Sequence, residues 1–221
     1  MNIVTTHHLT KYFGKGARQV KALDGIDLAI EKGKFTAITG ASGSGKTTLL
    51  NLIGGLEQPT EGTVVVDKLD LSKLTEEQRT VFRRRKIGFV FQHYNLIPDL
   101  TVRENILFPL ALDDCRADQK FFSQITGLLG LDKKLDSFPA ALSGGTQQRA
   151  AIARALIAKP AIVLADEPTA NLDIKTSQNV AGLLKMTAET FHQTLIMITH
   201  DLELAQLADQ LVRLQDGHII T

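Results

Sequence analysis

Residues 34–56 contain the feature that most constrains the fold of this chain. The segment KFTAITG is a short run of strand-forming residues that ends at Gly40, and GASGSGKTT occupies residues 40–48. KTTLLNLIGGL then places apolar residues at helical spacing until Gly54 and Gly55 end the pattern. A strand, a glycine-rich loop and a helix in this order predict an α/β fold with helices packed on a parallel sheet.

The glycine-rich loop has the spacing of a phosphate-binding site. Gly40, four further residues, and then Gly45, Lys46 and Thr47 match the pattern in which backbone N–H groups surround a phosphate. We expect Lys46 to neutralise the β- and γ-phosphates and Thr47 to bind Mg²⁺ through its hydroxyl, at the positive end of the following helix. The sequence therefore predicts a nucleoside triphosphate site formed by Gly40, Ser42, Gly43, Ser44, Gly45, Lys46, Thr47 and Thr48.

Strand and helix patterns alternate along the rest of the chain. GTVVVD, IGFVFQ, AIVLAD, TLIMITH and QLVRLQDG are typical of strands, whereas TEEQRTVFRRRK and SQNVAGLLKMTAETF have helical spacing. Residues 93–158 contain only helical patterns. Capping boxes at Thr75 with Gln78 and at Thr101 with Glu104 mark the starts of two helices. A mostly buried parallel sheet flanked by helices is expected, with an added helical lobe.

The basic run of Arg83, Arg84, Arg85 and Lys86 has two interpretations. It lies in the last turn of a predicted helix, where cations are stabilised by the helix dipole. The alternative is a docking patch for an acidic partner.

Composition limits the classes of protein that remain. A chain of 221 residues is expected to form one domain, with subdivisions. Its 25 Lys plus Arg against 24 Asp plus Glu give a net charge of +1, so we expect no nucleic-acid partner. The start MNIVTTHHLTKYFG is too polar for a signal peptide, and no apolar run is long enough to span a membrane. Membrane contact is therefore expected through a partner.

Cys115 is the single cysteine of the chain, so an internal disulfide is excluded.

Two adjacent carboxylates follow a buried strand in AIVLADEP. Asp166 and Glu167 come at the carboxyl end of this strand, where open parallel sheets bind their ligands. We expect Asp166 to hold Mg²⁺ through its water shell, and Glu167 to orient and deprotonate the water that attacks the γ-phosphate.

Four further motifs identify a family resemblance. LSGGTQQR precedes ADEPTANLD, FVFQ lies upstream, and MITHD lies downstream. Together they resemble the nucleotide-binding subunit of an ABC transporter, and the resemblance covers essentially the whole chain. GFVFQHYNLIPDLTVRENI and DEPTANLD are most similar to the group that serves lipoprotein release, macrolide export, antimicrobial-peptide resistance and cell-division signalling.

The resemblance implies a fold and a set of roles. The fold would be a P-loop core from residues 1–92 and 159–221, with an N-terminal antiparallel β portion and a helical signature subdomain at 93–158, all within one ABC ATPase domain. Tyr12 would stack on adenine, although the residue alone fits core packing equally well. Gln92 would meet Mg²⁺ and the attacking water, and the loop after it would contact the membrane partner. Asp173 would reach the other subunit, and His200 would contact the γ-phosphate.

The signature LSGG has a role only in a pair of subunits. The resemblance implies that two copies pack head to tail, so that Ser143, Gly144 and Gly145 of one chain cap the γ-phosphate held by the other. Glycine allows the backbone to approach the anion closely, and Ser143 adds a hydroxyl donor. The next position, usually glutamine in this family, is Thr146 here, and we expect its shorter side chain to tune the closed dimer.

The resemblance therefore implies an ATPase that uses ATP and Mg²⁺, dimerises with ATP, and drives a separate membrane permease from the inner face of the cell membrane. An alternative keeps the ATPase but uses it for transmembrane signalling to a cell-wall enzyme or sensor kinase. A chromosome-maintenance ATPase would need coiled-coil heptads or paired cysteines between its motifs, and residues 93–142 contain neither.

Overall fold

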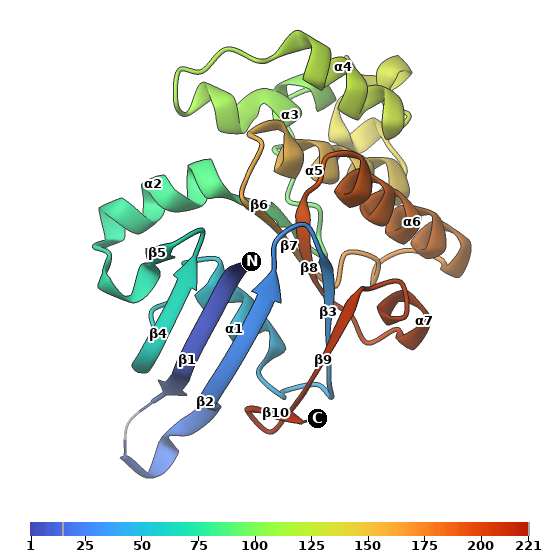
Figure 1. Ribbon diagram of the computed structural model, residues 1–221. Helices are drawn as coiled ribbons and strands as arrows, with labels where there is room; N and C mark the ends of the chain where they lie inside the picture. The colour runs from blue at the N-terminus through green and yellow to red at the C-terminus, as the bar shows by residue number, and fades with distance from the viewer. Residues whose placement is uncertain (15, 221) are drawn as a thin grey trace. The chain divides into compact units, whose positions relative to one another are not determined.

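The computed structural model describes residues 1–14 and 16–220, and the chain divides into two compact units (Figure 1). The first unit contains the chain up to Arg83 and from Thr194 onward, and the second is Arg84–Gln193. The division falls within helix α2 (Glu76–Lys86).

An antiparallel sheet forms one part of the first unit. Its strands lie in the order β2-β1-β4-β5, and alternating residues of β2 are buried, as expected for a sheet with one face in the core. This confirms the predicted N-terminal antiparallel portion. The strands are β1 (Asn2–Phe13), β2 (Val20–Glu31), β4 (Glu61–Val66) and β5 (Leu69–Asp70), with 3₁₀ turns at Gly16–Arg18 and Leu71–Lys73.

Parallel strands form the other part of the first unit. Strand β3 (Phe35–Thr39) pairs in parallel with β8 (Thr194–Ile198) and β9 (Gln210–Gln215), while β10 (His218–Ile220) returns antiparallel to β9. Every residue of β3 and β8 is buried, which explains their uninterrupted runs of strand-forming residues. Helix α1 (Lys46–Ile53) packs against β2, β4 and β8, and the short helix α7 (Leu202–Ala205) packs against β3.

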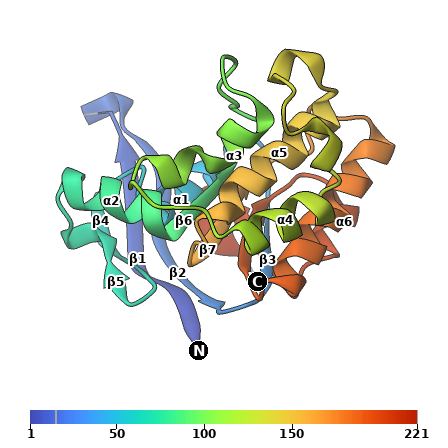
Figure 2. The same ribbon diagram turned by 90° about the horizontal axis from the view of Figure 1, so that it is seen from above.

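The second unit is built around helix α5 (Gly144–Ile157). Figure 2 shows α3 (Val102–Ala111), α4 (Gln119–Leu128) and α6 (Ile174–Thr190) grouped around it. Strands β6 (Ile87–Val90) and β7 (Ile162–Asp166) pair in parallel, and 3₁₀ turns occur at Asp132–Lys134 and Pro139–Ala141. As predicted, every element of regular secondary structure described between residues 93 and 158 is an α-helix or a 3₁₀ turn. The compact unit extends beyond that segment because α5 also packs on β6 and α6.

Both predicted capping boxes are present. The Thr75 N–H donates to Gln78 Oε1 at 3.0 Å, and the Gln78 N–H donates back to Thr75 Oγ1 at 3.3 Å. Thr101 and Glu104 make the same reciprocal pair at the start of α3. These contacts satisfy N–H groups that the first turn of a helix leaves without partners.

The basic run at the end of α2 is held by specific partners, so the helix-dipole interpretation was incomplete. Arg83 donates to the Gly55 carbonyl and to Glu76. Arg84 and Arg85 both contact the Asp113 carboxylate, with 2.8 Å between Arg85 Nε and Asp113 Oδ2. The guanidinium groups of Arg84 and Arg85 therefore hold the segment that follows α3 against the end of α2.

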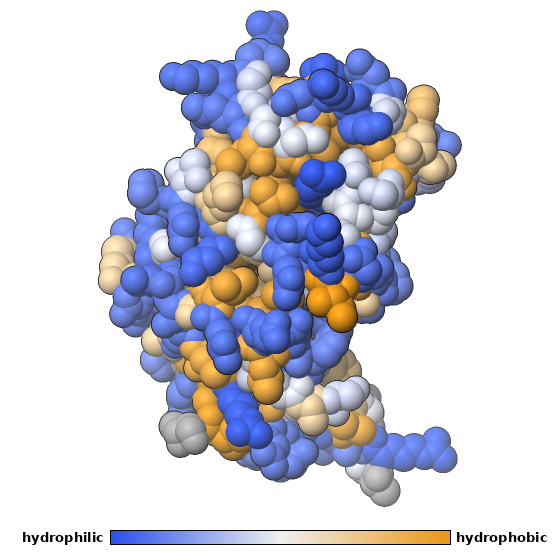
Figure 3. All heavy atoms as spheres, turned by 90° about the vertical axis from the view of Figure 1, so that its right-hand side faces the viewer, coloured by the Kyte–Doolittle hydropathy of each residue, from blue (hydrophilic) through white to orange (hydrophobic). Residues whose placement is uncertain are grey.

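No helix in residues 1–14 or 16–220 is long and apolar enough to cross a membrane. The face in Figure 3 carries hydrophobic patches separated by hydrophilic side chains. Cys115 is exposed.

The Asp113 cluster predicts a pH-dependent contribution to stability. Hydrogen bonding from Arg85, with the charges of Arg84 and Arg85, lowers the pKa of the Asp113 carboxyl. Because the folded pKa lies below the unfolded one, the stabilisation is present above the unfolded value near 4 and is lost as pH falls through the folded value. Asp113→Asn should lower the urea midpoint of unfolding at neutral pH, and the difference from the parent should shrink on acidification. Asp114→Asn, at the exposed neighbouring position, is the control; equal midpoints for all three proteins would contradict the assignment.

Candidate functional site

Lys46 closes the glycine-rich loop of the first unit. Its side chain is buried at the start of α1, and its Nζ donates to the carbonyl oxygens of Gly40 and Ala41 at 2.9 and 2.8 Å. The ammonium is therefore held inside the curve of the loop. A cation in this position favours an anion at the helix N-terminus, where backbone N–H groups have no intrahelical acceptors.

Two glycines let neighbouring strands approach this loop. A Cβ at Gly45 would lie 2.3 Å from the Ala22 carbonyl oxygen, and one at Gly40 would lie 2.1 Å from the Leu214 carbonyl oxygen. Gly45 also has a positive φ of 101°, which places it in the left-handed region. Strands β2 and β9 thus pack directly against the loop. A larger residue in place of Gly40 or Gly45 would displace the loop from these strands.

The loop also contains an unsatisfied polar atom. Ser44 is 3% exposed, and its Oγ has no hydrogen-bond partner among the described residues. No acidic residue lies in the first turn of α1. A buried hydroxyl without a partner is unusual and indicates a ligand that supplies one. Lys46, Ser44 and the helix end together fit a bound phosphate.

Tyr12 lies on β1, the strand that pairs with β2. It pairs with Lys21 across the antiparallel sheet, one residue before the Ala22 carbonyl that contacts Gly45. Its hydroxyl donates to Asp24 Oδ1 at 2.9 Å, and this hydrogen bond raises the pKa of the Tyr12 phenol. Lys21 Nζ lies 5.3 Å from the ring centroid. The ring is therefore fixed at its polar end, on a strand that pairs with β2.

His200 lies at the same sheet edge as the loop. Strands β3 and β8 run in parallel with Ile38 opposite Ile198, and the Thr199 N–H donates to the Ile38 carbonyl at 3.2 Å. Their carboxyl ends therefore lie side by side, with Gly40 following one strand and the exposed His200 following the other. The first unit therefore contains the loop and His200 at one sheet edge, and Tyr12 on the antiparallel sheet.

The carboxylates and Gln92 share an edge of the second unit. Strands β6 and β7 are parallel with Val90 opposite Ala165. Gln92 therefore follows the carboxyl end of β6, while Asp166 ends β7 and Glu167 comes directly after it. Glu167 has a φ of 44°, in the left-handed region that non-glycine residues rarely adopt. Such backbone strain is concentrated at functional sites.

Asn171 connects this edge to the following turn, although the sequence motif had drawn attention only to Asp173. Its Nδ2 donates to the Gln92 carbonyl at 3.1 Å and lies 3.1 Å from His93 Nδ1, while its Oδ1 accepts from Gln92 Nε2 at 3.4 Å. Asn171 therefore fixes both the backbone and the side chain of Gln92. The position of Asn171 within the ANLD motif is the sequence signal that could have identified it.

Ser143 is the N-cap of α5, and the two following glycines pack closely within the chain. A Cβ at Gly144 would lie 2.6 Å from the Tyr94 hydroxyl, and one at Gly145 would lie 2.5 Å from Thr176 Cγ2. A side chain at either glycine would have to displace one of these neighbouring side chains, a packing constraint that the sequence did not reveal. The Ser143 side chain remains exposed at the helix end.

Asp173 caps α6 in this structure. Its Oδ1 accepts from the Thr176 N–H at 3.0 Å and its Oδ2 from the Thr176 hydroxyl at 2.6 Å. Those hydrogen bonds lower the pKa of the Asp173 carboxyl. Since Thr176 also contacts Gly145, the cap lies beside the signature.

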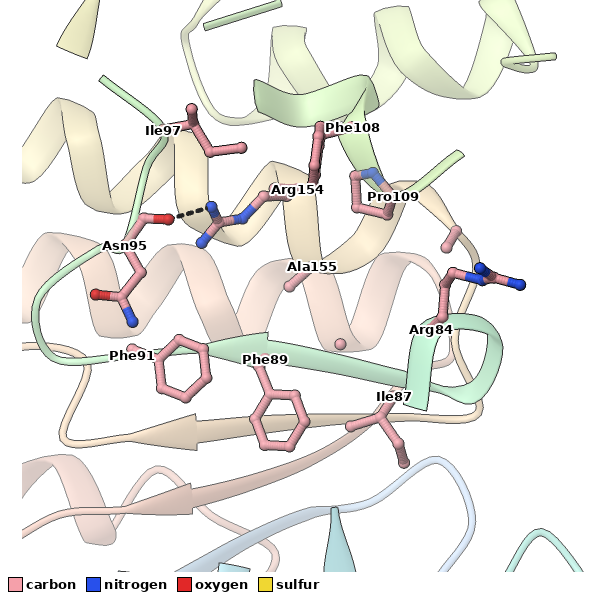
Figure 4. Close-up of a pocket in the computed structure, with 12 residues that line it drawn as sticks. Arg84, Ile87, Phe89, Phe91, Asn95, Ile97, Phe108, Pro109, Arg154 and Ala155 are labelled. Atoms are coloured by element: carbon pink, nitrogen blue, oxygen red, sulfur yellow. Dashed lines mark hydrogen bonds between the residues drawn. The ribbon is translucent and has the colours of Figure 1, made fainter. Parts of the chain in front are cut away.

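An apolar groove adjoins the loop after Gln92 (Figure 4). The Phe89 and Phe91 rings stack with centroids 5.3 Å apart along β6, and Arg154 of α5 donates to the carbonyls of Asn95 and Tyr94. Phe108 and Pro109 of α3 line the same groove. Burial lowers the pKa of the Arg154 guanidinium. No sequence pattern indicated this groove, because its residues come from β6, α3 and α5.

Comparisons with known proteins agree with the motifs. The ABC transporter family profile matches residues 23–170. The chain is 39% identical over 224 residues to the bacitracin export ATP-binding protein BceA of Halalkalibacterium halodurans, covering 100% of this chain and 88% of that protein. It is 42% identical over 220 residues to the lipoprotein-releasing system ATP-binding protein LolD of Legionella pneumophila, covering 98% and 96%.

A solved structure extends the likeness to the fold. The ATP-binding cassette MJ0796, in a dimeric post-hydrolysis state bound to ADP and Pi, is 40% identical with a TM-score of 0.88, covering 99% of this chain and 97% of that one. The predicted P-loop α/β fold and the predicted family are thereby confirmed. The chain belongs to the ABC transporter family, as one of its ATP-binding, ATP-hydrolysing subunits.

Proposed function

We propose that this chain hydrolyses Mg-ATP between two head-to-tail copies and thereby drives a separate membrane permease. The observation that carries the proposal is that α1, which begins at Lys46 in the first unit, and α5, which is capped by Ser143 in the second, both lack acidic residues in their first turns. Both helix N-termini are therefore suited to an anion. The dimeric MJ0796 cassette, bound to ADP and Pi, supports the association of two copies.

Each residue of the site has a proposed role. Residues 40–48 bind the phosphates with Lys46 as the cation, and Tyr12 stacks on adenine. Thr47, Gln92 and Asp166 would hold Mg²⁺, Asp166 through its water shell, and the ion would balance the phosphate charge. Oxygen ligands of this kind suit Mg²⁺, which needs few protein ligands when phosphates supply the others. Glu167 accepts the proton of the attacking water, and His200 contacts the γ-phosphate. Asn171 positions Gln92, and Asp173 faces the second copy.

Lys46 and Glu167 should fail in different ways when substituted. Lys46→Ala removes a cation that meets the phosphates before reaction, so ATP affinity should fall about tenfold or more. Glu167→Gln removes only the base, so ATP should still bind while single-turnover hydrolysis slows by about a hundredfold or more. Equilibrium binding and single-turnover assays on both variants separate the two defects. Hydrolysis by Glu167→Gln at the parent rate would show that another group is the base.

The head-to-tail arrangement can be tested in the Glu167→Gln protein, where ATP persists. Mg-ATP should convert this protein to a dimer in sedimentation velocity. Adding Ser143→Arg should abolish the dimer, because a long side chain would fill the place of the γ-phosphate, but ATP binding by the monomer should survive. Ser123→Arg, at an exposed serine of α4, is the matched control. Loss of monomer ATP binding in Ser143→Arg would place the signature in the same site as Lys46.

The relatives indicate which transport systems this subunit resembles. BceA is named for bacitracin export and LolD for a lipoprotein-releasing system. These names concern export and lipoprotein release, so we propose a peptide, lipoprotein or drug-like substrate that the permease selects. The chain would then lie at the inner face of the cell membrane, attached through that permease.

We further propose that the groove between α3, α5 and β6 contacts the permease. Its lining is largely apolar, and Phe108 at its rim is 36% exposed. Phe91 and Asn95, on either side of Gln92 and Tyr94, also line it. A permease segment in the groove would therefore press directly on the loop that contains Gln92.

Phe108→Glu should release the tagged chain from the membrane fraction of cells that make the whole transporter, because a carboxylate would be buried against Phe89 and Phe91. ATP hydrolysis by the isolated chain should stay unchanged. Met186→Glu, at a hydrophobic residue of α6 that is 46% exposed, is the control. Equal membrane retention of both variants would exclude this groove as the docking surface.

A further inference from the structure

Thr146 is turned into the protein beside Ser143. Its side chain is 8% exposed, whereas Ser143 is exposed. Thr146 Oγ1 lies 2.9 Å from Ser143 Oγ and accepts a hydrogen bond from Arg149 Nη2 at 3.1 Å. The Thr146 N–H also donates to Ser143 Oγ, at 3.4 Å. The signature of this chain thus contains a row of three polar side chains that ends at its exposed serine.

The chemistry of the three groups fixes the direction of this row. A guanidinium can only donate, so Thr146 Oγ1 is the acceptor from Arg149. Thr146 is buried, and among the described residues its hydroxyl contacts only Arg149 Nη2 and Ser143 Oγ. The one acceptor left for its proton is Ser143 Oγ, since a buried hydroxyl proton needs a partner. Ser143 therefore accepts from Thr146, and its own proton is left to point outward.

The charge at this helix end agrees with that direction. The first turn of α5 has no acidic residue, and Arg149 follows in the second turn of the helix. A positive group in this place strengthens the attraction for an anion. Each hydrogen bond in a row that begins at a charged donor also polarises the next one.

We propose that Thr146 is a positioning residue, which passes the hydrogen-bond donation of Arg149 to Ser143 and so orients the Ser143 proton toward the γ-phosphate held by the second copy. A glutamine at this position would be too long to make the same inward contact with Ser143. The inference rests on the proposed head-to-tail dimer. It assigns to Thr146 a role in dimer affinity and none in ATP binding by the monomer.

The test uses the full chain carrying Glu167→Gln, with saturating Mg-ATP. Thr146→Val keeps the shape of the side chain but removes the hydroxyl, and should raise the dimer dissociation constant about tenfold. Thr146→Ser keeps the hydroxyl, and should stay within about twofold of the parent. Affinity for a fluorescent ATP analogue, measured at protein concentrations below dimerisation, should be the same for all three. Melting temperatures report on folding, and Thr146→Ala repeats the test should Thr146→Val fail to fold.

A double-mutant cycle separates positioning from packing. Because Thr146 acts through the Ser143 hydroxyl, Thr146→Val should change the dimer dissociation constant by less than about twofold when Ser143→Ala is already present. An undiminished tenfold effect in that background would overturn the inference, as would equal affinities of Thr146→Val and Thr146→Ser, and in both cases the dimer itself would stand. Absence of a Mg-ATP dimer from the parent would instead overturn the proposed function, and the inference with it.

Discussion

The close approach of two strands to the phosphate loop is the constraint on which the first unit depends. The Ala22 and Leu214 carbonyl oxygens occupy the space where side chains at Gly45 and Gly40 would stand. Strands β2 and β9 can therefore contact the loop directly, and Lys46 is left with the loop carbonyls as its nearest acceptors. A rigid cradle results, in which the N–H groups and the ammonium are positioned before any phosphate binds. Preorganisation of this kind reduces the ordering cost of binding.

The same packing explains why the site residues come from separate parts of the sequence. Parallel strands end at a common edge, so each short segment that follows a strand contributes one group. In the first unit these are the loop after β3 and His200 after β8. In the second unit they are Gln92 after β6 and the carboxylates at the end of β7, with Asn171 holding the first segment to the second. In each unit, buried strands thus hold several different functional groups at one sheet edge.

Sequence reasoning succeeded where a structure is determined locally. The capping boxes at Thr75 and Thr101 involve residues three positions apart, and both helices begin where these boxes predict. Buried strands such as β3 and β8 were found because both faces are buried, which gives uninterrupted runs of strand-forming residues. The contacts of Arg85 with Asp113 and of Asn171 with Gln92 could not be predicted, because they join positions 28 and 79 residues apart. Only the fold brings these side chains together.

Helix α5 connects the groove to the signature. Arg154 and Gln148 donate to the carbonyls of Tyr94, Asn95 and Phe91, so three carbonyls around Gln92 are attached to this one helix. Ser143 lies eleven positions before Arg154 at the N-terminal end of the same helix, about 16 Å along its axis. Ala150, Ala151, Ile152 and Ala153 between them are fully buried, which favours movement of the helix as a rigid body. A displacement in the groove would therefore be transmitted to the signature end, and the contact with Thr146 ties the Ser143 hydroxyl to the helix so that the two move together.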